Sequence, residues 1–170
     1  MRIGLIGLGR IGAFHAGTLS ALPSVTSLVV TDAVPAAIDV VVDRYGVEAV
    51  DTPEKLLASG VDGVVVAAAT DAHPELVVAA VEAGVPVFCE KPVAKTMAEG
   101  VAVARRVAGS GVPNQIGYPH RFDVGCAAVR EAARVVPSGP RVIAATVAGW
   151  PSEPPQGDAR GDRTALRRHS

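Results

Sequence analysis

The chain has 170 residues, of which 49% are hydrophobic and 19% are charged, and its formal net charge is -1. This composition is typical of a globular protein with a substantial core and excludes a largely disordered chain. The near-zero net charge gives no electrostatic basis for binding nucleic acid or an anionic membrane. No apolar stretch reaches the roughly 20 residues that a membrane-spanning helix needs. The two cysteines, Cys89 and Cys126, are too far apart in sequence to indicate a metal site or a disulfide framework. We therefore expect a cytoplasmic protein with reduced thiols and no bound metal.

Apolar runs of strand length alternate with segments of helical periodicity as far as Tyr118. Pro35, Thr52 and the capping-box pair Thr96 and Glu99 indicate where helices begin. Strands are predicted at 2–6, 27–31, 61–67, 85–89 and 114–118, and helices at 11–22, 35–46, 73–83, 96–108 and 124–135, with a short one opening at Thr52-Pro53. This alternation predicts an α/β fold, a doubly wound parallel sheet of the Rossmann type with helices on both faces.

The regular alternation does not extend over the whole chain. Residues 1–120 are predicted to form an NAD-binding Rossmann domain. Residues 121–147, with one possible strand at 141–147, are expected to be only the start of a second, incomplete domain. Residues 148–170 are polar and rich in arginine, and we expect them to form a disordered tail.

A glycine-rich turn follows the first predicted strand and opens the first helix, with the sequence Gly7-Leu8-Gly9-Arg10-Ile11-Gly12. In a dinucleotide-binding turn, the first glycine permits the tight turn and the second lets a pyrophosphate approach the backbone. The third lets the helix pack close to the strand. The N–H groups of Arg10 and Ile11 would face the phosphates at the positive end of the helix dipole. Because the motif alone is a weak signal, a glycine-rich turn without a ligand is the alternative.

Asp32 ends the second predicted strand, about twenty residues after the glycines, where such proteins place a ribose-binding carboxylate. A carboxylate there accepts hydrogen bonds from both ribose hydroxyls and repels a 2′-phosphate. No arginine or lysine occurs at positions 33–37. The sequence therefore favours NAD over NADP as the cofactor, and a simple capping role for Asp32 is the alternative.

Polar residues also follow two later strands. Thr70 and His73 come after the strand at 61–67, and Glu90 and Lys91 come after the strand at 85–89. Ligands bind at the carboxyl ends of the strands in a doubly wound sheet. Thr70, His73 and Glu90 are therefore expected to contribute to cofactor binding, and Lys91 to act as the catalytic residue that polarises a substrate hydroxyl. A helix-capping role for His73 and solvated loop charges at Glu90 and Lys91 are the alternatives.

Together these residues resemble the Gfo/Idh/MocA oxidoreductase family, and within it the inositol 2-dehydrogenase type. The resemblance covers about residues 1–130. It rests on the glycine turn followed by His15, on Thr70-Asp71-Ala72-His73, on Phe88-Cys89-Glu90-Lys91-Pro92, and on the segments 115–118 and 121–123. It implies a two-domain, homo-oligomeric enzyme that moves a hydride between a ring secondary alcohol of a polyol or sugar and NAD. It also implies that Lys91 is the motif lysine and that Pro92 has an unusual peptide geometry.

The chain departs from the family in its second half. Members are roughly twice as long, and their second domain carries an Asp-x-x-x-His motif whose histidine is the general acid and base. None of Asp123, Asp158 and Asp162 is followed by histidine at that spacing. We interpret the ending as an early stop or an out-of-frame segment, so that the chain is truncated; a deliberately shortened protein is the alternative. Two functions therefore stay open: an NAD-dependent polyol dehydrogenase, and a non-catalytic dinucleotide-binding module or remnant.

Overall fold

The computed structural model describes residues 1–135, so the strand expected at 141–147 and the tail expected at 148–170 lie outside the described residues. The strands are β1 (Arg2–Ile6), β2 (Ser27–Thr31), β3 (Glu48–Ala49), β4 (Gly63–Val66), β5 (Val87–Glu90) and β6 (Asn114–Gly117). The helices are α1 (Arg10–Ala21), α2 (Pro35–Tyr45), α3 (Pro53–Leu57), α4 (His73–Glu82), α5 (Met97–Val107) and α6 (Val124–Val135), with short 3-10 turns η1 (Thr70–Ala72) and η2 (Pro119–Arg121).

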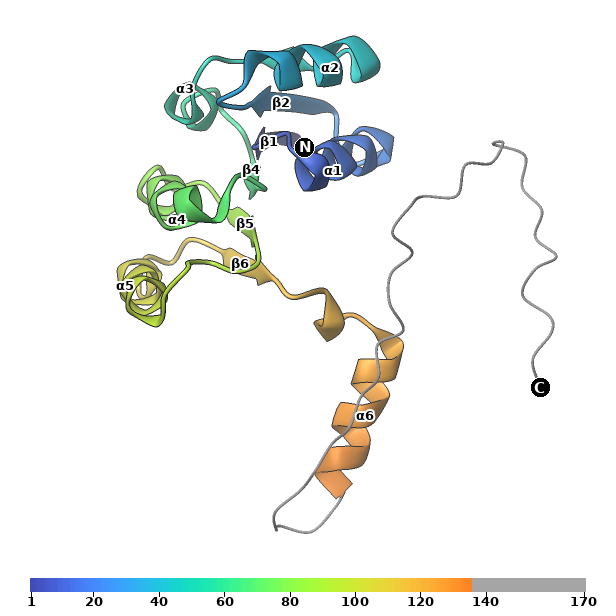
Figure 1. Ribbon diagram of the computed structural model, residues 1–170, viewed down its shortest axis with the longest axis vertical. Coiled ribbons are helices and arrows are strands. Elements are labelled where there is room, and N and C mark those ends of the chain that lie inside the picture. Colours follow the sequence, from blue (N-terminus) through green and yellow to red (C-terminus); the bar gives the residue numbers. More distant parts are fainter. Residues whose placement is uncertain (136–170) are drawn as a thin grey trace, which may run out of the picture. The chain divides into compact units, whose positions relative to one another are not determined.

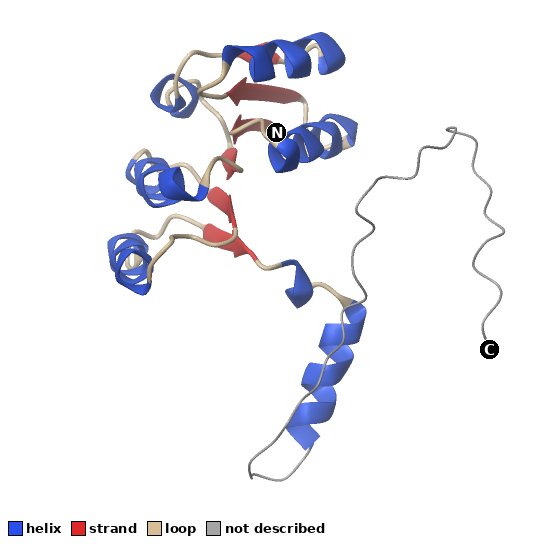
Figure 2. Ribbon diagram, in the orientation of Figure 1, coloured by secondary structure: helices blue, strands red, loops and turns tan. Residues whose placement is uncertain are grey.

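The strands of the described region form one parallel sheet in the order β3-β2-β1-β4-β5-β6. The chain begins in the middle of the sheet, winds outward through β2 and β3, then returns past β1 and winds the other way. This is the strand order of a doubly wound Rossmann sheet, so the predicted fold class is confirmed. Figures 1 and 2 show the strands stacked along the domain with helices beside them.

Local sequence signals set the helix starts. Thr52 caps α3 by accepting a hydrogen bond from the N–H of Lys55. Thr96 and Glu99 form the predicted capping box at the start of α5, each side chain bonding the other residue's backbone N–H. Pro35 opens α2, because its fixed φ suits the first turn of a helix and its missing N–H is not needed there.

Each face of the sheet carries its own apolar core, because side chains alternate between the faces along a strand. Leu5 belongs to the core under α1 and α2, whereas its neighbour Ile6 belongs to the core under α3, α4 and α5. In Figure 1, α3, α4 and α5 lie along one side of the sheet and α1 lies on the other. The sheet is thereby held between two helical layers, and its strand ends are left free to carry a site.

Cys89 is fully buried in β5, and burial together with the neighbouring Glu90 raises the pKa of its thiol to about 12. Cys126 is exposed, and neither cysteine forms a disulfide within the described residues. Cys89 is therefore a neutral packing residue at physiological pH.

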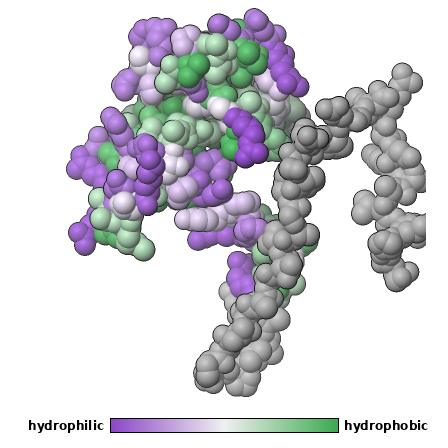
Figure 3. Space-filling model, in the orientation of Figure 1, coloured by the Kyte–Doolittle hydropathy of each residue, from purple (hydrophilic) through white to green (hydrophobic). Residues whose placement is uncertain are grey.

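Residues Met1–Arg130 form a compact unit. On the face shown in Figure 3, hydrophilic residues gather at the outer margins of this unit and more apolar residues lie between them. In the described part of the chain, none of the helices combines the length and apolarity that crossing a membrane requires.

Candidate functional site

The strand register brings the predicted site residues to one edge of the sheet. Ile6 at the end of β1 pairs with Thr31 of β2 and with Val66 of β4. Val66 in turn pairs with Cys89 of β5, and Glu90 pairs with Gly117 of β6. The residues that follow these strands, Gly7, Asp32, Ala67, Lys91 and Tyr118, therefore share the carboxyl edge of the sheet.

Two glycines of the first turn are required by packing. Gly7 has a φ of 94°, and a Cβ there would lie 2.4 Å from the backbone nitrogen of Ala68. A Cβ at Gly12 would lie 1.9 Å from the carbonyl oxygen of Gly7. The turn therefore closes against the loop after β4, and α1 sits directly on the turn, as the glycine motif predicts.

Gly9 differs from these two glycines, because a Cβ built there meets no atom within 4 Å. Its φ of -61° is also accessible to any residue, so the fold of the chain itself does not require glycine at this position. Gly9 precedes α1, whose first turn has no side-chain cap and no acidic residue. The turn therefore has open space beside uncapped helix N–H groups, and Arg10 and Ile11, which follow, are exposed. This arrangement fits the pyrophosphate of a dinucleotide.

Asp32 is tied to this turn. Its Oδ2 accepts a hydrogen bond from the N–H of Leu8 at 2.5 Å, and its Oδ1 accepts one from the N–H of Val34 at 2.7 Å. An ionised carboxylate has about four acceptor positions, so both oxygens keep capacity for further donors. The carboxylate is half-buried beside the phosphate turn, where ribose hydroxyls are donors of the right kind.

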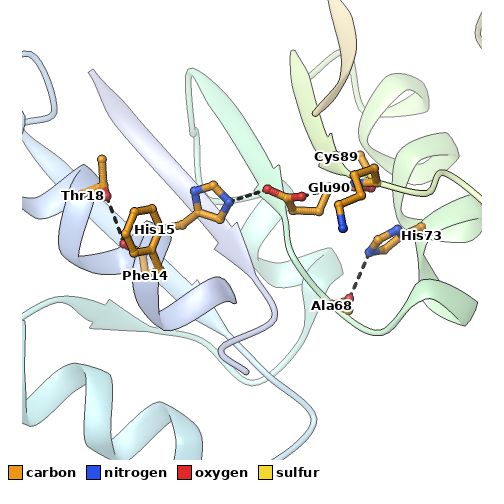
Figure 4. Close-up of polar contacts among 8 residues, drawn as sticks. Phe14, His15, Thr18, Ala68, His73, Cys89 and Glu90 are labelled. Carbon is orange, nitrogen blue, oxygen red and sulfur yellow. Dashed lines mark hydrogen bonds and ion pairs between the residues drawn. The ribbon is translucent and has the colours of Figure 1, made fainter. Parts of the chain in front are cut away.

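Glu90 is held from the other side by α1. His15 Nε2 lies 2.9 Å from Glu90 Oε1, and each side chain is only about one-fifth exposed, at 20% and 21%. The second carboxylate oxygen of Glu90 accepts the N–H of Lys91 at 3.3 Å. His15 also meets the ring of Phe88 edge-on, with the ring centroids 6.1 Å apart. Figure 4 shows this pair spanning the gap between α1 and the end of β5.

His73, the first residue of α4, is 2% exposed. Its Nδ1 lies 2.7 Å from the carbonyl oxygen of Pro92, and its Nε2 lies 3.0 Å from the carbonyl oxygen of Ala68. Both ring nitrogens therefore face the backbone, and neither is turned to an open surface. Thr70 is half-buried at the start of η1.

Lys91 follows directly after Glu90 and is exposed at the same edge. Within residues 1–135, its ammonium group has no hydrogen-bond or ion-pair partner, so it is free to meet a ligand. The Lys91–Pro92 peptide bond is cis, which confirms the unusual geometry expected at Pro92.

A hollow of about 350 Å³ lies on the sheet face that carries α1, but its lining includes Met1, Asp62, Pro86 and Pro113, which lie at the amino ends of their strands. It is therefore at the opposite edge from Gly7 and Lys91. Ligands of doubly wound sheets bind at the carboxyl edge, so we assign the site to the glycine turn and not to this hollow.

Comparison with known proteins decides the family. The Gfo/Idh/MocA model, described as an oxidoreductase family with an NAD-binding Rossmann fold, matches residues 1–118. The chain belongs to the Gfo/Idh/MocA oxidoreductase family. The resemblance expected from the motifs is thereby confirmed, and with it an NAD-binding Rossmann fold.

Members of the Gfo/Idh/MocA family that resemble the chain include inositol dehydrogenases. A myo-inositol dehydrogenase of Streptomyces leeuwenhoekii is 40% identical over 131 residues, which cover 76% of this chain and 40% of that protein. An inositol 2-dehydrogenase of Rhizobium meliloti is 34% identical over 132 residues, which cover 78% and 40%. The chain thus spans about 40% of the length of these relatives.

Solved structures of the family have the same fold. A myo-inositol dehydrogenase from Corynebacterium glutamicum superposes with a TM-score of 0.70 at 32% identity, covering 79% of this chain and 40% of that one. A scyllo-inositol dehydrogenase from Lactobacillus casei, solved with bound NAD(H) and scyllo-inositol, gives a TM-score of 0.73 at 25% identity, covering 79% and 41%.

The sequence alone assigns no role to His15. Gly12 and Ala16 are the buried residues of α1, and His15 lies one position before Ala16. The helical period therefore places His15 at the margin of the buried face, next to the end of β5. This position on the helix is the signal that the sequence offers for His15. Its partner Glu90 on β5 can be identified only once the strand order is known.

Proposed function

We propose that this chain binds NAD in preference to NADP at the carboxyl edge of its sheet. Gly7 and Gly12 shape the phosphate turn, and Gly9 leaves room for the pyrophosphate above the N–H groups of Arg10 and Ile11. Asp32 accepts the ribose hydroxyls, and its negative charge opposes a 2′-phosphate. The observation that carries the proposal is the open space at Gly9 beside a carboxylate that is fixed to the same turn.

We further propose that the reaction is the oxidation of a ring secondary alcohol of a polyol, of the kind named for the inositol dehydrogenases that the chain resembles. Bound NAD would supply the acceptor for the hydride, and the proton of the substrate hydroxyl would leave to solvent water at this exposed edge. Lys91 acts as the catalytic residue, because its free ammonium group stands at the site edge and can donate a hydrogen bond to the substrate hydroxyl and stabilise the developing negative charge on that oxygen.

The other side chains at this edge serve the cofactor and Lys91. Glu90 orients the Lys91 backbone through its hydrogen bond to the Lys91 N–H. Thr70 stands at the start of η1, on the loop after β4, and can reach the nicotinamide half of the cofactor. His73 holds the backbone beneath this edge in place, since both of its ring nitrogens contact backbone carbonyl oxygens.

A non-catalytic dinucleotide-binding module is the second candidate function. It rests on the same glycine turn and carboxylate, which can hold a dinucleotide whether or not a reaction follows. Both candidates share the NAD site and differ in turnover, so an assay of NAD reduction separates them.

Replacing Lys91 by alanine tests the proposed reaction. In an assay of NAD reduction with myo-inositol, scyllo-inositol and hexoses, we expect Lys91→Ala to lower kcat by on the order of 10²-fold or more, because it removes the group that polarises the hydroxyl. The Kd for NAD should change by less than about threefold, since Lys91 is exposed and has no structural partner in the described region. Reduction at equal rates by both proteins would contradict the role of Lys91, and NAD binding without reduction of NAD would favour the non-catalytic module.

A further inference from the structure

The buried imidazole of His73 has two hydrogen-bond acceptors and no donor around its ring nitrogens. Nδ1 lies 2.7 Å from the Pro92 carbonyl oxygen and Nε2 lies 3.0 Å from the Ala68 carbonyl oxygen. A neutral imidazole carries one N–H, so it can donate to one of these oxygens and must turn a lone pair toward the other. An imidazolium carries two N–H groups and satisfies both.

The two carbonyl groups belong to the two loops that form the site. Ala68 lies in the loop after β4, where its backbone nitrogen is the closest atom to a Cβ built on Gly7. Pro92 follows Lys91 directly in the turn after β5. His73 therefore connects the loop that packs on the phosphate turn with the turn that carries Lys91. Figure 4 shows the ring of His73 directed toward the Ala68 carbonyl, on the opposite side of Glu90 from His15.

We propose that His73 is the positioning residue for Lys91: as an imidazolium it donates one N–H to Pro92 and the other to Ala68, and so fixes the Lys91–Pro92 turn against the loop beside Gly7. The proposal rests on the role of Lys91 put forward above. It assigns His73 a structural charge below the surface in place of a direct contact with the cofactor.

Charged groups on the surrounding elements act on this imidazolium in both directions. The N-terminus of α4, on which His73 lies, opposes a positive charge, as does the neighbouring Lys91. The Cys89 thiol in β5 is neutral, since its pKa is raised to about 12. Three carboxylates on these elements favour the charge: Asp71 of η1, which is paired with Lys95, Glu75 of α4 and Glu90 of β5. The two hydrogen bonds to backbone carbonyls stabilise the charged form in addition.

The number of ring protons decides how firmly the Lys91 turn is held. With both ring nitrogens protonated, His73 makes both bonds. With one proton lost, one loop is released and the Lys91 turn becomes less fixed.

The test uses the full chain, labelled with ¹⁵N, without cofactor. Long-range ¹H–¹⁵N spectra at about pH 5 are expected to show protons on both ring nitrogens of His73. If the ring loses a proton as the pH is raised to about 8, the Lys91 amide resonance should shift with it; a ring that stays doubly protonated over the range also supports the proposal. A ring with one protonated nitrogen at every pH in that range would overturn it.

A variant pair gives the second readout. His73→Phe keeps a planar ring without N–H donors, and the matched control is His120→Phe, which changes an exposed histidine whose ring nitrogen lies near the Cys126 sulfur, away from the Lys91 turn. We expect faster hydrogen exchange at the Lys91 amide in His73→Phe and no change in the control. Where NAD reduction is measurable, kcat should fall by on the order of 10²-fold while the Kd for NAD stays within about threefold.

The spectra need neither cofactor nor turnover, so they separate this proposal from the proposed reaction. Unchanged exchange at Lys91 in a folded His73→Phe protein would overturn the positioning role, whatever the activity. If His73→Phe does not fold, the protonation of the ring in the unmodified chain still decides the proposal.

Discussion

A Gly12→Ala protein is expected to lose roughly 3 kcal/mol of stability and all measurable affinity for NAD. The added Cβ would lie 1.9 Å from the carbonyl oxygen of Gly7, and that atom belongs to the backbone, which cannot rotate away as a side chain can. Gly7 itself is fixed, because its N–H donates to the Thr31 carbonyl at 2.9 Å. The alanine must therefore push α1 off the turn, which moves the N–H groups that face the phosphates.

Thermal unfolding followed by circular dichroism measures the first part of this effect. A loss of about 3 kcal/mol corresponds to a fall in Tm of roughly 10 °C for a domain of this size. A Gly12→Ala protein with an unchanged Tm and unchanged NAD binding would contradict the close contact between α1 and the turn.

A Gly9→Ala protein is expected to behave in the opposite way, with near-normal stability and weak NAD binding. No atom lies within 4 Å of the added Cβ, so the substitution causes no clash in the free protein. Alanine is a poorer N-cap than glycine, so a loss of up to about 1 kcal/mol is expected. The new methyl group occupies the space that we assign to the pyrophosphate, and we expect the Kd for NAD to rise by on the order of 100-fold, about 2.7 kcal/mol, the size of one charge-assisted hydrogen bond.

The two variants together distinguish a packing glycine from a ligand glycine. Calorimetric titration with NAD and a thermal melt on each protein are sufficient. Unchanged NAD affinity in Gly9→Ala would mean that the open space at this position is not where the phosphates bind. A large fall in the Tm of Gly9→Ala would mean instead that the position serves the fold.

Much of the fold follows from local signals that act within one turn of the chain. Thr52, Pro35 and the pair Thr96 and Glu99 bond or constrain residues at most three positions away, so the sequence alone predicts where α2, α3 and α5 begin. The strand starts are less well predicted. β4 begins at Gly63 and β5 at Val87, each two residues later than expected.

The reason for these late starts lies in what hydrophobicity measures. Val61 and Val85 are buried in the core, but the N–H of Val85 bonds the Ala80 carbonyl at the end of α4 and not a neighbouring strand. Apolar residues thus indicate burial, and the sheet ladder begins only where the backbone meets its partner. The sequence gives no signal for β3, because its two residues, Glu48 and Ala49, are exposed and too few to show alternation.

The candidate site likewise has one part that the local sequence predicts and another that it does not. The sequence predicts separate roles for Gly7, Gly9 and Gly12, because each role depends on the local turn. The contacts between distant elements were not predictable from one sequence. The bond from His15 to Glu90 joins residues 75 positions apart, and that from His73 to Pro92 joins residues 19 apart. Such pairs depend on strand order and register, which come from packing of the whole sheet.

Titration of the unmodified chain with NAD and with NADP tests most directly whether the first turn and Asp32 form an NAD site. Because the Asp32 carboxylate already accepts the Leu8 N–H at the phosphate turn, a 2′-phosphate would face a fixed negative charge. We predict that NAD binds with a Kd at least about tenfold lower than that of NADP. Binding of NADP as tight as or tighter than that of NAD, or no binding of either dinucleotide, would contradict an NAD site at the first turn and Asp32.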